Sequence, residues 1–328
     1  MRRLLGAMVL LPALAGCSST AEPGATPTPP ASSTPAPPTS KPTTPPTETP
    51  TPTPTPTPQR RASPDDVDVS VATRAVRHLA GVIGPRPGTS PAYVEAAAWV
   101  QGRLEASGWQ VTRQRFATPA GVSWGVPVQA GPSINLVATR GDVEPGKPWL
   151  AVGAHLDTVP QAPGAEDNAS GVGALLATAD AIAETRTRLP VVLIAFGSEE
   201  PRGPSDDDHH YGSRAYVASL TPAERRGLRG MISLDRVGVG DVMPVGTPAE
   251  PNALTDEITA AARRAGEATV LDPFQRSSDH WSFVRDGLPG ARLGSTPYAG
   301  YHSEADTPDV VRRSQLAAAA RIVVSWLR

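Results

Sequence analysis

The stretch Trp149–Asp157, with the sequence WLAVGAHLD, decides the fold class of this chain. Its first six residues, Trp149–Ala154, form a continuous apolar run, which is typical of a central strand covered on both faces. We interpret Val191–Phe196 and Gly230–Leu234 as two further buried strands. Ala169–Glu184, between the first two, has the composition of a helix rich in Ala and Leu. Strands that alternate with helices in this way indicate a mostly parallel sheet.

The segments on either side of these strands fit the same architecture. The chain has 328 residues, enough for one large domain or two small ones. Hydrophobic spacing predicts helices at Val67–Ala80, Pro91–Ser107, Ala253–Ala265 and Ser314–Leu327, strands at Trp109–Phe116 and Ile134–Thr139, and a turn at Gly84–Gly88. We therefore predict an α/β fold of three layers (αβα) around a central, mostly parallel but mixed sheet.

Potential metal ligands follow all three buried strands. His155 comes directly after the first strand, Glu199 follows the second within three residues, and Asp235 directly follows the third. In open α/β sheets, sites form just past the carboxyl ends of the strands. Imidazoles and carboxylates placed there are what a water-activating zinc site requires. The placement of the three residues, more than any single motif, predicts a metal centre at this edge.

The first two sequence motifs supply one imidazole and two carboxylates. His155 and Asp157 share a face of extended backbone, so we interpret His155 as a ligand and Asp157 as the carboxylate that orients it. The alternative is a His–Asp pair that only caps a strand end. Asp167 precedes a helix, where it would serve either as the N-cap or, if Ser170 takes that place, as a carboxylate that bridges two ions.

The later motifs supply the remaining ligands. Glu199 and Glu200 are adjacent carboxylates that repel each other unless cations balance them. We interpret Glu200 as a ligand and Glu199 as a free general base, with a solvated pair as the alternative. Asp235 ends an apolar run and must be paired, either with a metal ion or with Arg236.

The last motif, near the end of the chain, supplies the second imidazole from His302. Tyr301 offers a phenol that can stabilise a developing oxyanion, and Asp306 is a candidate to orient His302. Four carboxylates, those of Asp167, Glu199, Glu200 and Asp235, balance the charge of two Zn²⁺ ions.

Taken in order, these motifs resemble the dinuclear zinc aminopeptidase family, metallopeptidase family 28, over nearly everything from residue 66 onward. The stretches that carry the resemblance are His155–Asp157, Asp167–Gly171, Glu199–Glu200, Leu234–Asp235, Tyr301–His302 with Asp306–Thr307, Gly84–Gly88 and Ser278–His280. The resemblance implies a zinc-exopeptidase type of fold and two zinc ions. One ion would lie on His155, Asp167 and Asp235, and the other on Asp167, Glu200 and His302. It also implies Glu199 as general base, Tyr301 as oxyanion donor and a cis peptide bond after Asp167.

Two features depart from the pattern of many family members. Pro201–Tyr211 is an insertion that carries an acidic run followed by His209 and His210. We interpret it as a solvated loop, with a substrate gate or a further cation site as alternatives. Arg236 stands where many members have an apolar residue, which leaves the preferred end of the substrate open.

The N-terminal segments predict export. Two arginines precede the short apolar run Leu4–Leu14, as in a signal peptide, and Leu14–Cys17 resembles a bacterial lipobox. That resemblance implies cleavage before Cys17 and a lipid on its sulfur; an ordinary signal is the alternative. The Pro- and Thr-rich segment that follows lacks apolar side chains to offset the entropy of ordering. We predict a signal peptide at 1–16, a lipidated Cys17 with a disordered linker at 17–65, and a catalytic domain at 66–328.

These observations lead to one predicted function and several alternatives. The formal net charge of −2 argues against a nucleic-acid partner. We predict a zinc-dependent aminopeptidase that acts on peptides outside the cell, lipid-anchored to the outer face of the bacterial membrane. His and carboxylate ligands also suit other divalent metals. The alternatives are a carboxypeptidase that uses Arg214, Arg236 or Arg276, a glutaminyl-cyclase-like acyl transferase, or a non-catalytic surface binding module.

Overall fold

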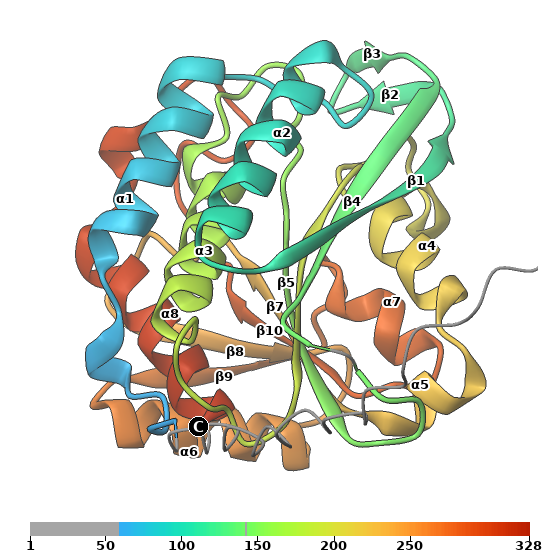
Figure 1. Ribbon diagram of the computed structural model, residues 1–328. Coiled ribbons are helices and arrows are strands. Elements are labelled where there is room, and N and C mark those ends of the chain that lie inside the picture. The colour runs from blue at the N-terminus through green and yellow to red at the C-terminus, as the bar shows by residue number, and fades with distance from the viewer. Residues whose placement is uncertain (1–58, 142) are drawn as a thin grey trace, which may run out of the picture. The chain divides into compact units, whose positions relative to one another are not determined.

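The computed structural model describes residues 59–141 and 143–328 (Figure 1). The predicted signal peptide, Cys17 and most of the predicted linker lie outside these residues. The strands are β1 (Gln110–Thr118), β2 (Gly121–Ser123), β3 (Val126–Val128), β4 (Gly131–Thr139), β5 (Trp149–His155), β6 (Val191–Phe196), β7 (Leu228–Asp235), β8 (Met243–Thr247), β9 (Thr269–Pro273) and β10 (Gly290–Gly294). The α-helices are α1 (Val69–His78), α2 (Pro91–Ala106), α3 (Gly171–Ala181), α4 (Tyr211–Ser219), α5 (Pro222–Gly227), α6 (Ala253–Ala265), α7 (His280–Arg285) and α8 (Arg313–Leu327).

The strands form an eight-stranded mixed sheet with the order β1-β4-β6-β5-β7-β10-β8-β9. Its centre is parallel, because β5 pairs in parallel with β6 and β7, and β7 pairs in parallel with β10. Antiparallel pairs join β1 to β4, β4 to β6, and β10 to β8. The remaining strands, β2 and β3, form a separate hairpin. The predicted fold class is confirmed, although β8, β9 and β10 were not among the predicted strands.

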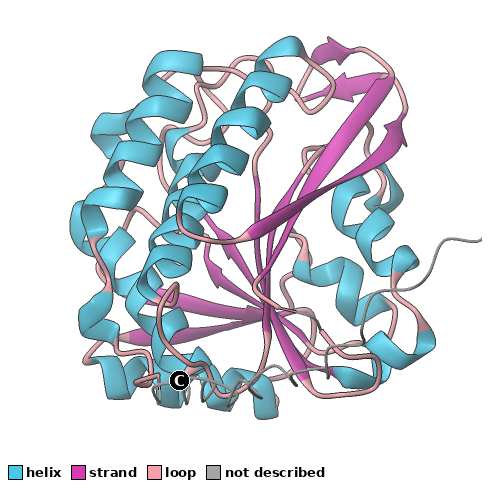
Figure 2. Ribbon diagram, viewed as in Figure 1, coloured by secondary structure: helices cyan, strands magenta, loops and turns pink. Residues whose placement is uncertain are grey.

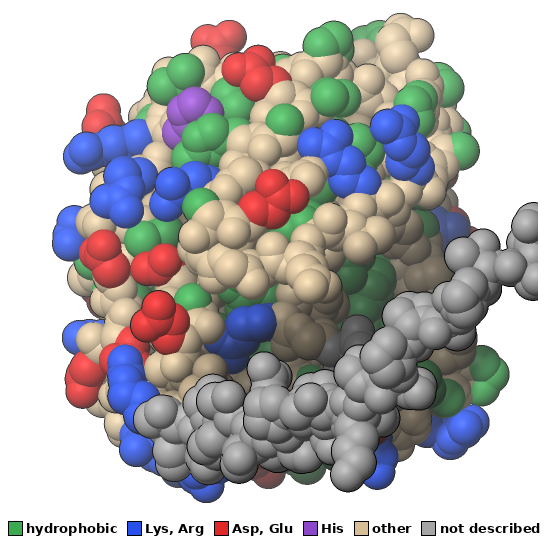
Figure 3. All heavy atoms as spheres, in the orientation of Figure 1, with side chains coloured by type: hydrophobic (Ala, Val, Ile, Leu, Met, Phe, Trp, Pro, Cys, Tyr) green, Lys and Arg blue, Asp and Glu red, His purple; other side chains and the backbone are tan. Residues whose placement is uncertain are grey.

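Helices cover the sheet on both faces and complete the three layers (Figures 1 and 2). The larger hydrophobic cluster joins one face of the sheet to α1, α2, α3, α6 and α8, and the smaller one joins the other face to α4 and α7. On the surface shown in Figure 3, charged side chains of both signs are interspersed among polar ones.

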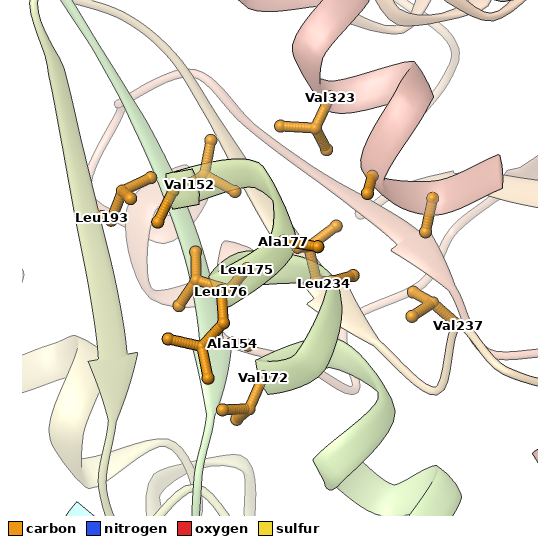
Figure 4. Close-up of a cluster of buried hydrophobic side chains, with 14 of the residues drawn as sticks. Val152, Ala154, Val172, Leu175, Leu176, Ala177, Leu193, Leu234, Val237 and Val323 are labelled. Atoms are coloured by element: carbon orange, nitrogen blue, oxygen red, sulfur yellow. The ribbon is translucent and has the colours of Figure 1, made fainter. Parts of the chain in front are cut away.

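The central strand β5 explains why the sheet needs both layers. All seven of its residues are buried. Val152 and Ala154 point towards α3, where they meet Val172 and Leu176 (Figure 4), while Ala151 belongs to the cluster on the opposite face. Burial of a Val or Leu side chain contributes about 1.5–3 kcal/mol, so the strand is stabilised from both faces.

The folded part begins slightly before the predicted boundary at residue 66. Arg61 forms a bridge with Arg186, Ala62 is fully buried, and Arg60 makes an ion pair of 2.7 Å with Asp66. Among the residues that the structure describes, no helix is both long and apolar enough to cross a membrane.

Candidate metal centre

The predicted ligands meet at the carboxyl edge of the central strands. His155 and Asp235 are the last residues of β5 and β7. Glu199 and Glu200 lie just past the end of β6, and His302 lies in the segment that follows β10. These four strands are neighbours in the sheet, and the parallel pairs bring their ends to the same edge. The topology therefore places residues that are far apart in sequence around one point.

The distances divide the ligands into two groups that share Asp167. His155 Nε2 lies 3.1 Å from Asp167 Oδ1 and 3.6 Å from Asp235 Oδ1. His302 Nε2 lies 3.0 Å from Asp167 Oδ2 and 3.4 Å from Glu200 Oε2. Each oxygen of one carboxylate thus faces a different imidazole. The Asp167 carboxylate therefore connects the two groups.

The chemistry of the donors fits divalent cations. All five side chains are buried, with at most 8% of their surface exposed. Within the described part of the chain, Glu200 Oε1 and Asp235 Oδ1 have no hydrogen-bond partner. Buried carboxylate oxygens without partners are costly, and a cation would satisfy them. Imidazole nitrogens and carboxylate oxygens are ligands that zinc accepts.

The pKa values of Glu199, Glu200 and His302 are shifted because these buried charged side chains lie close together without a cation. Burial, together with the negative charge of Asp167, raises the pKa of Glu200 to about 8. Burial also raises the pKa of Glu199 to about 8, helped by the charges of Asp235 and Asp157. Burial lowers the pKa of His302, but the carboxylates of Glu200 and Asp167 outweigh it and raise the pKa to about 10. Protons therefore occupy this site where divalent ions would otherwise balance the charge.

Asp306 differs from its predicted role. Its carboxylate accepts hydrogen bonds from the backbone N–H groups of Glu166 (2.7 Å) and Asp167 (3.1 Å). His302 Nδ1, which Asp306 was expected to hold, has no hydrogen-bond partner among the described residues. Asp306 thus fixes the loop that carries the bridging carboxylate. As the resemblance implied, the Asp167–Asn168 peptide bond is cis.

Ser170 occupies the N-cap position of α3, but its side chain makes no capping hydrogen bond there, and the side chain of Asn168 takes that role. Asn168 Oδ1 accepts from the N–H groups of Gly171 and Arg236, and its Nδ2 donates to the carbonyl of Leu234. Ser170 Oγ instead donates to the carbonyl of Glu166. The loop before α3 is therefore tied to the end of β7, where Asp235 lies.

The carboxylate of Asp157 makes hydrogen bonds with the backbone of Glu199 and Glu200 but lies farther from His155. Its carboxylate accepts from the N–H groups of Glu199 (3.0 Å) and Glu200 (3.2 Å). The Nδ1 atom of His155 lies 3.2 Å from the backbone carbonyl of Asp157 but 3.8 Å from its carboxylate. The expectation that the carboxylate itself orients His155 is corrected accordingly: the carbonyl is the nearer partner.

Arg86 is a residue whose role the sequence reasoning missed. It was noted only as part of the Gly84–Gly88 turn, yet it is fully buried. Its guanidinium donates to the carbonyls of Leu79, Gly84, Leu156, Pro163 and Gly164. These bonds connect the segment after β5 with the loop before Asp167. An arginine between two prolines in a turn was the available signal.

The Pro201–Tyr211 insertion is partly a surface loop and partly a piece of the site. Asp208 binds Ser205 within its own turn, and Asp207 forms an ion pair with Arg285. His210, however, is buried, and its Nε2 lies 3.0 Å from Glu199 Oε1. Burial lowers the pKa of His210 to about 4, so its imidazole is neutral near pH 7. Its backbone N–H also donates to the carbonyl of Glu199.

Aromatic side chains form a wall beside His302. The ring of Tyr301 stacks on the His302 imidazole with centroids 3.7 Å apart. Trp124, at the tip of the β2–β3 hairpin, meets the same imidazole edge-on at 4.4 Å. Tyr301 is 37% exposed, so its ring borders both the centre and the solvent. Trp124 was not singled out from the sequence.

Comparisons with known proteins agree with this geometry. The family model described as "Peptidase family M28" matches residues 135–327. The protein YfbL of Escherichia coli K12, itself uncharacterised, is 26% identical over 310 residues, which is 82% of this chain and 88% of YfbL. The probable lipoprotein aminopeptidase LpqL of Mycobacterium tuberculosis is 29% identical over 203 residues, which cover 51% of this chain but 39% of LpqL.

Solved structures share the fold. An aminopeptidase from Aneurinibacillus sp. strain AM-1 superposes with a TM-score of 0.69 at 19% identity and covers 80% of this chain and 94% of its own. A glutaminyl cyclase from Bacteroides thetaiotaomicron superposes with a TM-score of 0.67 at 23% identity, covering 80% and 97%. At these identities the likeness concerns the fold alone. The family match is broader evidence, since it spans more than half of the sequence, and the chain therefore belongs to peptidase family M28.

Proposed function

We propose that this metallopeptidase is a zinc-dependent aminopeptidase with two zinc ions. One ion would be held by His155, Asp167 and Asp235, and the other by Asp167, Glu200 and His302. Zinc, when bound, supplies a Lewis acid that lowers the pKa of a water molecule and polarises a carbonyl group. The observation that carries the proposal is the position of Asp167, whose two oxygens face the two imidazoles at 3.1 and 3.0 Å.

The protein's own groups have distinct roles in this proposal. Glu199 accepts a proton from the attacking water at its carboxylate and passes it to the leaving amine. Tyr301 donates its phenol O–H to the oxyanion that develops on the scissile carbonyl. In an aminopeptidase, the free N-terminal amine of the peptide would lie near the position of the second zinc ion and its carboxylates.

Glu199 needs a separate argument, because its carboxylate also lies near enough to His155 and Asp235 to serve as a ligand. Two contacts favour the base. His210 Nε2 lies 3.0 Å from Oε1 of Glu199 without making a hydrogen bond, so this oxygen faces an imidazole that is not one of the proposed ligands. Glu200, by contrast, faces His302 and has an oxygen without any partner in the described region. We therefore assign Glu200 to the metal and Glu199 to proton transfer.

The test combines turnover with metal content. Glu199→Gln should abolish hydrolysis of aminoacyl-nitroanilides while the zinc content stays near that of the wild type. Glu105→Gln, a change on the exposed side of α2, is the matched control and should leave both unchanged. A fully active Glu199→Gln variant would refute the base assignment. Hydrolysis of N-blocked peptides, but not of peptides with a free amine, would overturn the aminopeptidase proposal.

Cleavage from the other end of a peptide is the second candidate. A carboxypeptidase requires a cation for the terminal carboxylate. Arg214 donates to the carbonyls of Asp207 and His209, and Arg276 packs over Trp281, which leaves Arg236 as the candidate beside the centre. N-blocked peptides with a free C-terminus would be cleaved only by the carboxypeptidase, and amidated peptides with a free N-terminus only by the aminopeptidase.

We also propose that the enzyme is exported and lipid-anchored through Cys17. The support is the lipobox-like Leu14–Cys17 and the likeness to LpqL of Mycobacterium tuberculosis, which is described as a probable lipoprotein aminopeptidase. Cys17→Ser should abolish labelling with a radioactive fatty acid and release the protein from the membrane fraction. Continued labelling of this variant would refute the anchor.

A further inference from the structure

A cavity of about 510 Å³ lies beside the metal centre, beyond the ends of β7 and β10. Arg236, the residue after Asp235, forms part of its wall, as does Tyr301, the residue before His302. Val270 and Leu271 of β9 and Pro297 supply apolar lining. Two residues that line the cavity are therefore adjacent in sequence to proposed metal ligands. A substrate residue that is cleaved at the centre can extend into this cavity.

The two arginines of the cavity differ in what already binds them. Arg292 is buried and has local partners: its guanidinium forms a 3.0 Å ion pair with Asp272 and donates to Ser277 Oγ. The Arg236 guanidinium makes no side-chain hydrogen bond within the described residues, and its only ion pair there is a 3.9 Å approach of Nε to Asp235. It stacks on the Tyr301 ring at 4.4 Å. Arg236 thus presents N–H donors without acceptors.

The backbone fixes the position of this cation. Arg236 has a φ of 54° just past the end of β7, and its N–H donates to Asn168 Oδ1. Its side chain is only 13% exposed. A guanidinium stays charged at any physiological pH, and its planar fork matches the two oxygens of a carboxylate. Asp235 cannot fully neutralise it, because the proposed function assigns the Asp235 carboxylate to a metal ion.

We infer that Arg236 forms a subsite for a carboxylate of the peptide substrate. This inference rests on the proposed function, because it names the substrates that the same centre would prefer. The carboxylate has two possible sources. It is either the side chain of an N-terminal Glu or Asp, or the C-terminal carboxylate of a short peptide. In both cases Arg236 binds the oxygens bidentately, while the Tyr301 ring holds the plane of the guanidinium.

The first experiment measures kcat/KM for the zinc-loaded full chain. One arm compares Glu-nitroanilide with Gln-nitroanilide, which differ in charge but hardly in shape. The other arm compares a free dipeptide with its C-terminal amide. The wild type should prefer the carboxylate in at least one arm, and Arg236→Met should reduce that preference by about 10- to 100-fold. The arm that responds identifies the source.

Two further variants separate charge and geometry from general damage. Arg236→Lys keeps the charge without the planar fork and should retain only part of the preference. Arg276→Met removes an exposed arginine of a neighbouring loop that does not line the cavity. This variant should retain the full carboxylate preference of the wild type. The inference is wrong if the wild type shows no carboxylate preference in either arm, or if Arg236→Met leaves both ratios unchanged.

A binding measurement keeps this test distinct from that of the proposed function. Calorimetry with free glutamate and free glutamine needs no turnover. If glutamate binds more tightly than glutamine and Arg236→Met removes this difference, the subsite is supported even when no peptide is hydrolysed. In that case only the proposed function would be refuted. Conversely, ready hydrolysis of neutral substrates, with equal binding of glutamate and glutamine and equal kcat/KM for the free dipeptide and its amide, would refute the subsite and leave the proposed function intact.

Discussion

Arg86 offers the sharpest test of how the centre is held together. Arg86→Met keeps an unbranched side chain, although a shorter one, and removes every guanidinium donor. Three of its bonds are buried, those to the carbonyls of Leu79, Leu156 and Gly164, at 3.3, 2.7 and 3.0 Å. A buried polar group without a partner costs about 1–3 kcal/mol. We therefore expect a loss of at least about 3 kcal/mol from a total stability of about 5–15 kcal/mol.

The assay is urea unfolding of the metal-free and the zinc-loaded protein. Arg77→Met, on the exposed side of α1, is the matched control and should change the free energy of unfolding by less than about 0.5 kcal/mol. Because Arg86 connects the segment after His155 with the loop before Asp167, zinc affinity should also fall, by about 10- to 100-fold. A loss of stability below about 1 kcal/mol would refute the reasoning.

Three other predictions follow from the same contacts. His210→Leu removes the imidazole beside Glu199 and should lower kcat about 10- to 100-fold with zinc content unchanged, whereas His209→Leu should have little effect; equal kcat values for the two variants would contradict this. Asp306→Ala frees the N–H of Asp167 and should weaken zinc binding about 10- to 100-fold in a competition titration with a chelator, and unchanged affinity would argue against it. The pKa of Glu199 is raised to about 8 in the folded metal-free protein. Between pH 6.5 and 8 the folded protein therefore retains the proton of this carboxyl group, whereas the unfolded chain has released it. Stability should therefore fall as pH rises, by up to about 1.4 kcal/mol per pH unit for each such group, and Glu199→Gln should flatten the slope in urea titrations; a flat wild-type profile would disprove the shift.

The sequence by itself determined the fold class and the placement of three residues of the centre, His155, Glu199 and Asp235. The continuous apolar run Trp149–Ala154 is typical of a strand covered on both faces, so it indicated the centre of the sheet. His155 and Asp235 follow such strands directly, and parallel strands bring equivalent ends to one edge. Here local periodicity was sufficient, because strand direction and side-chain alternation are properties of the backbone itself.

Other elements were beyond local reasoning. The strand β10, Gly290–Gly294, has two glycines and an arginine in five residues, so its sequence does not resemble a buried strand. Arg292 is tolerated there because Asp272, from β9, pairs with it. His302 lies in the segment that follows β10, so its place at the edge of the sheet was not predictable from a buried strand pattern.

Only the tertiary structure decided the partners of individual side chains. Nothing near Arg86 or His210 in the sequence indicates that one binds five backbone carbonyls or that the other contacts Glu199. The same holds for Asp306, which holds the loop of Asp167 instead of His302. The physical reason is that these side chains lie on loops. Packing against distant segments fixes the conformation of a loop, whereas a strand is defined largely by its own residues.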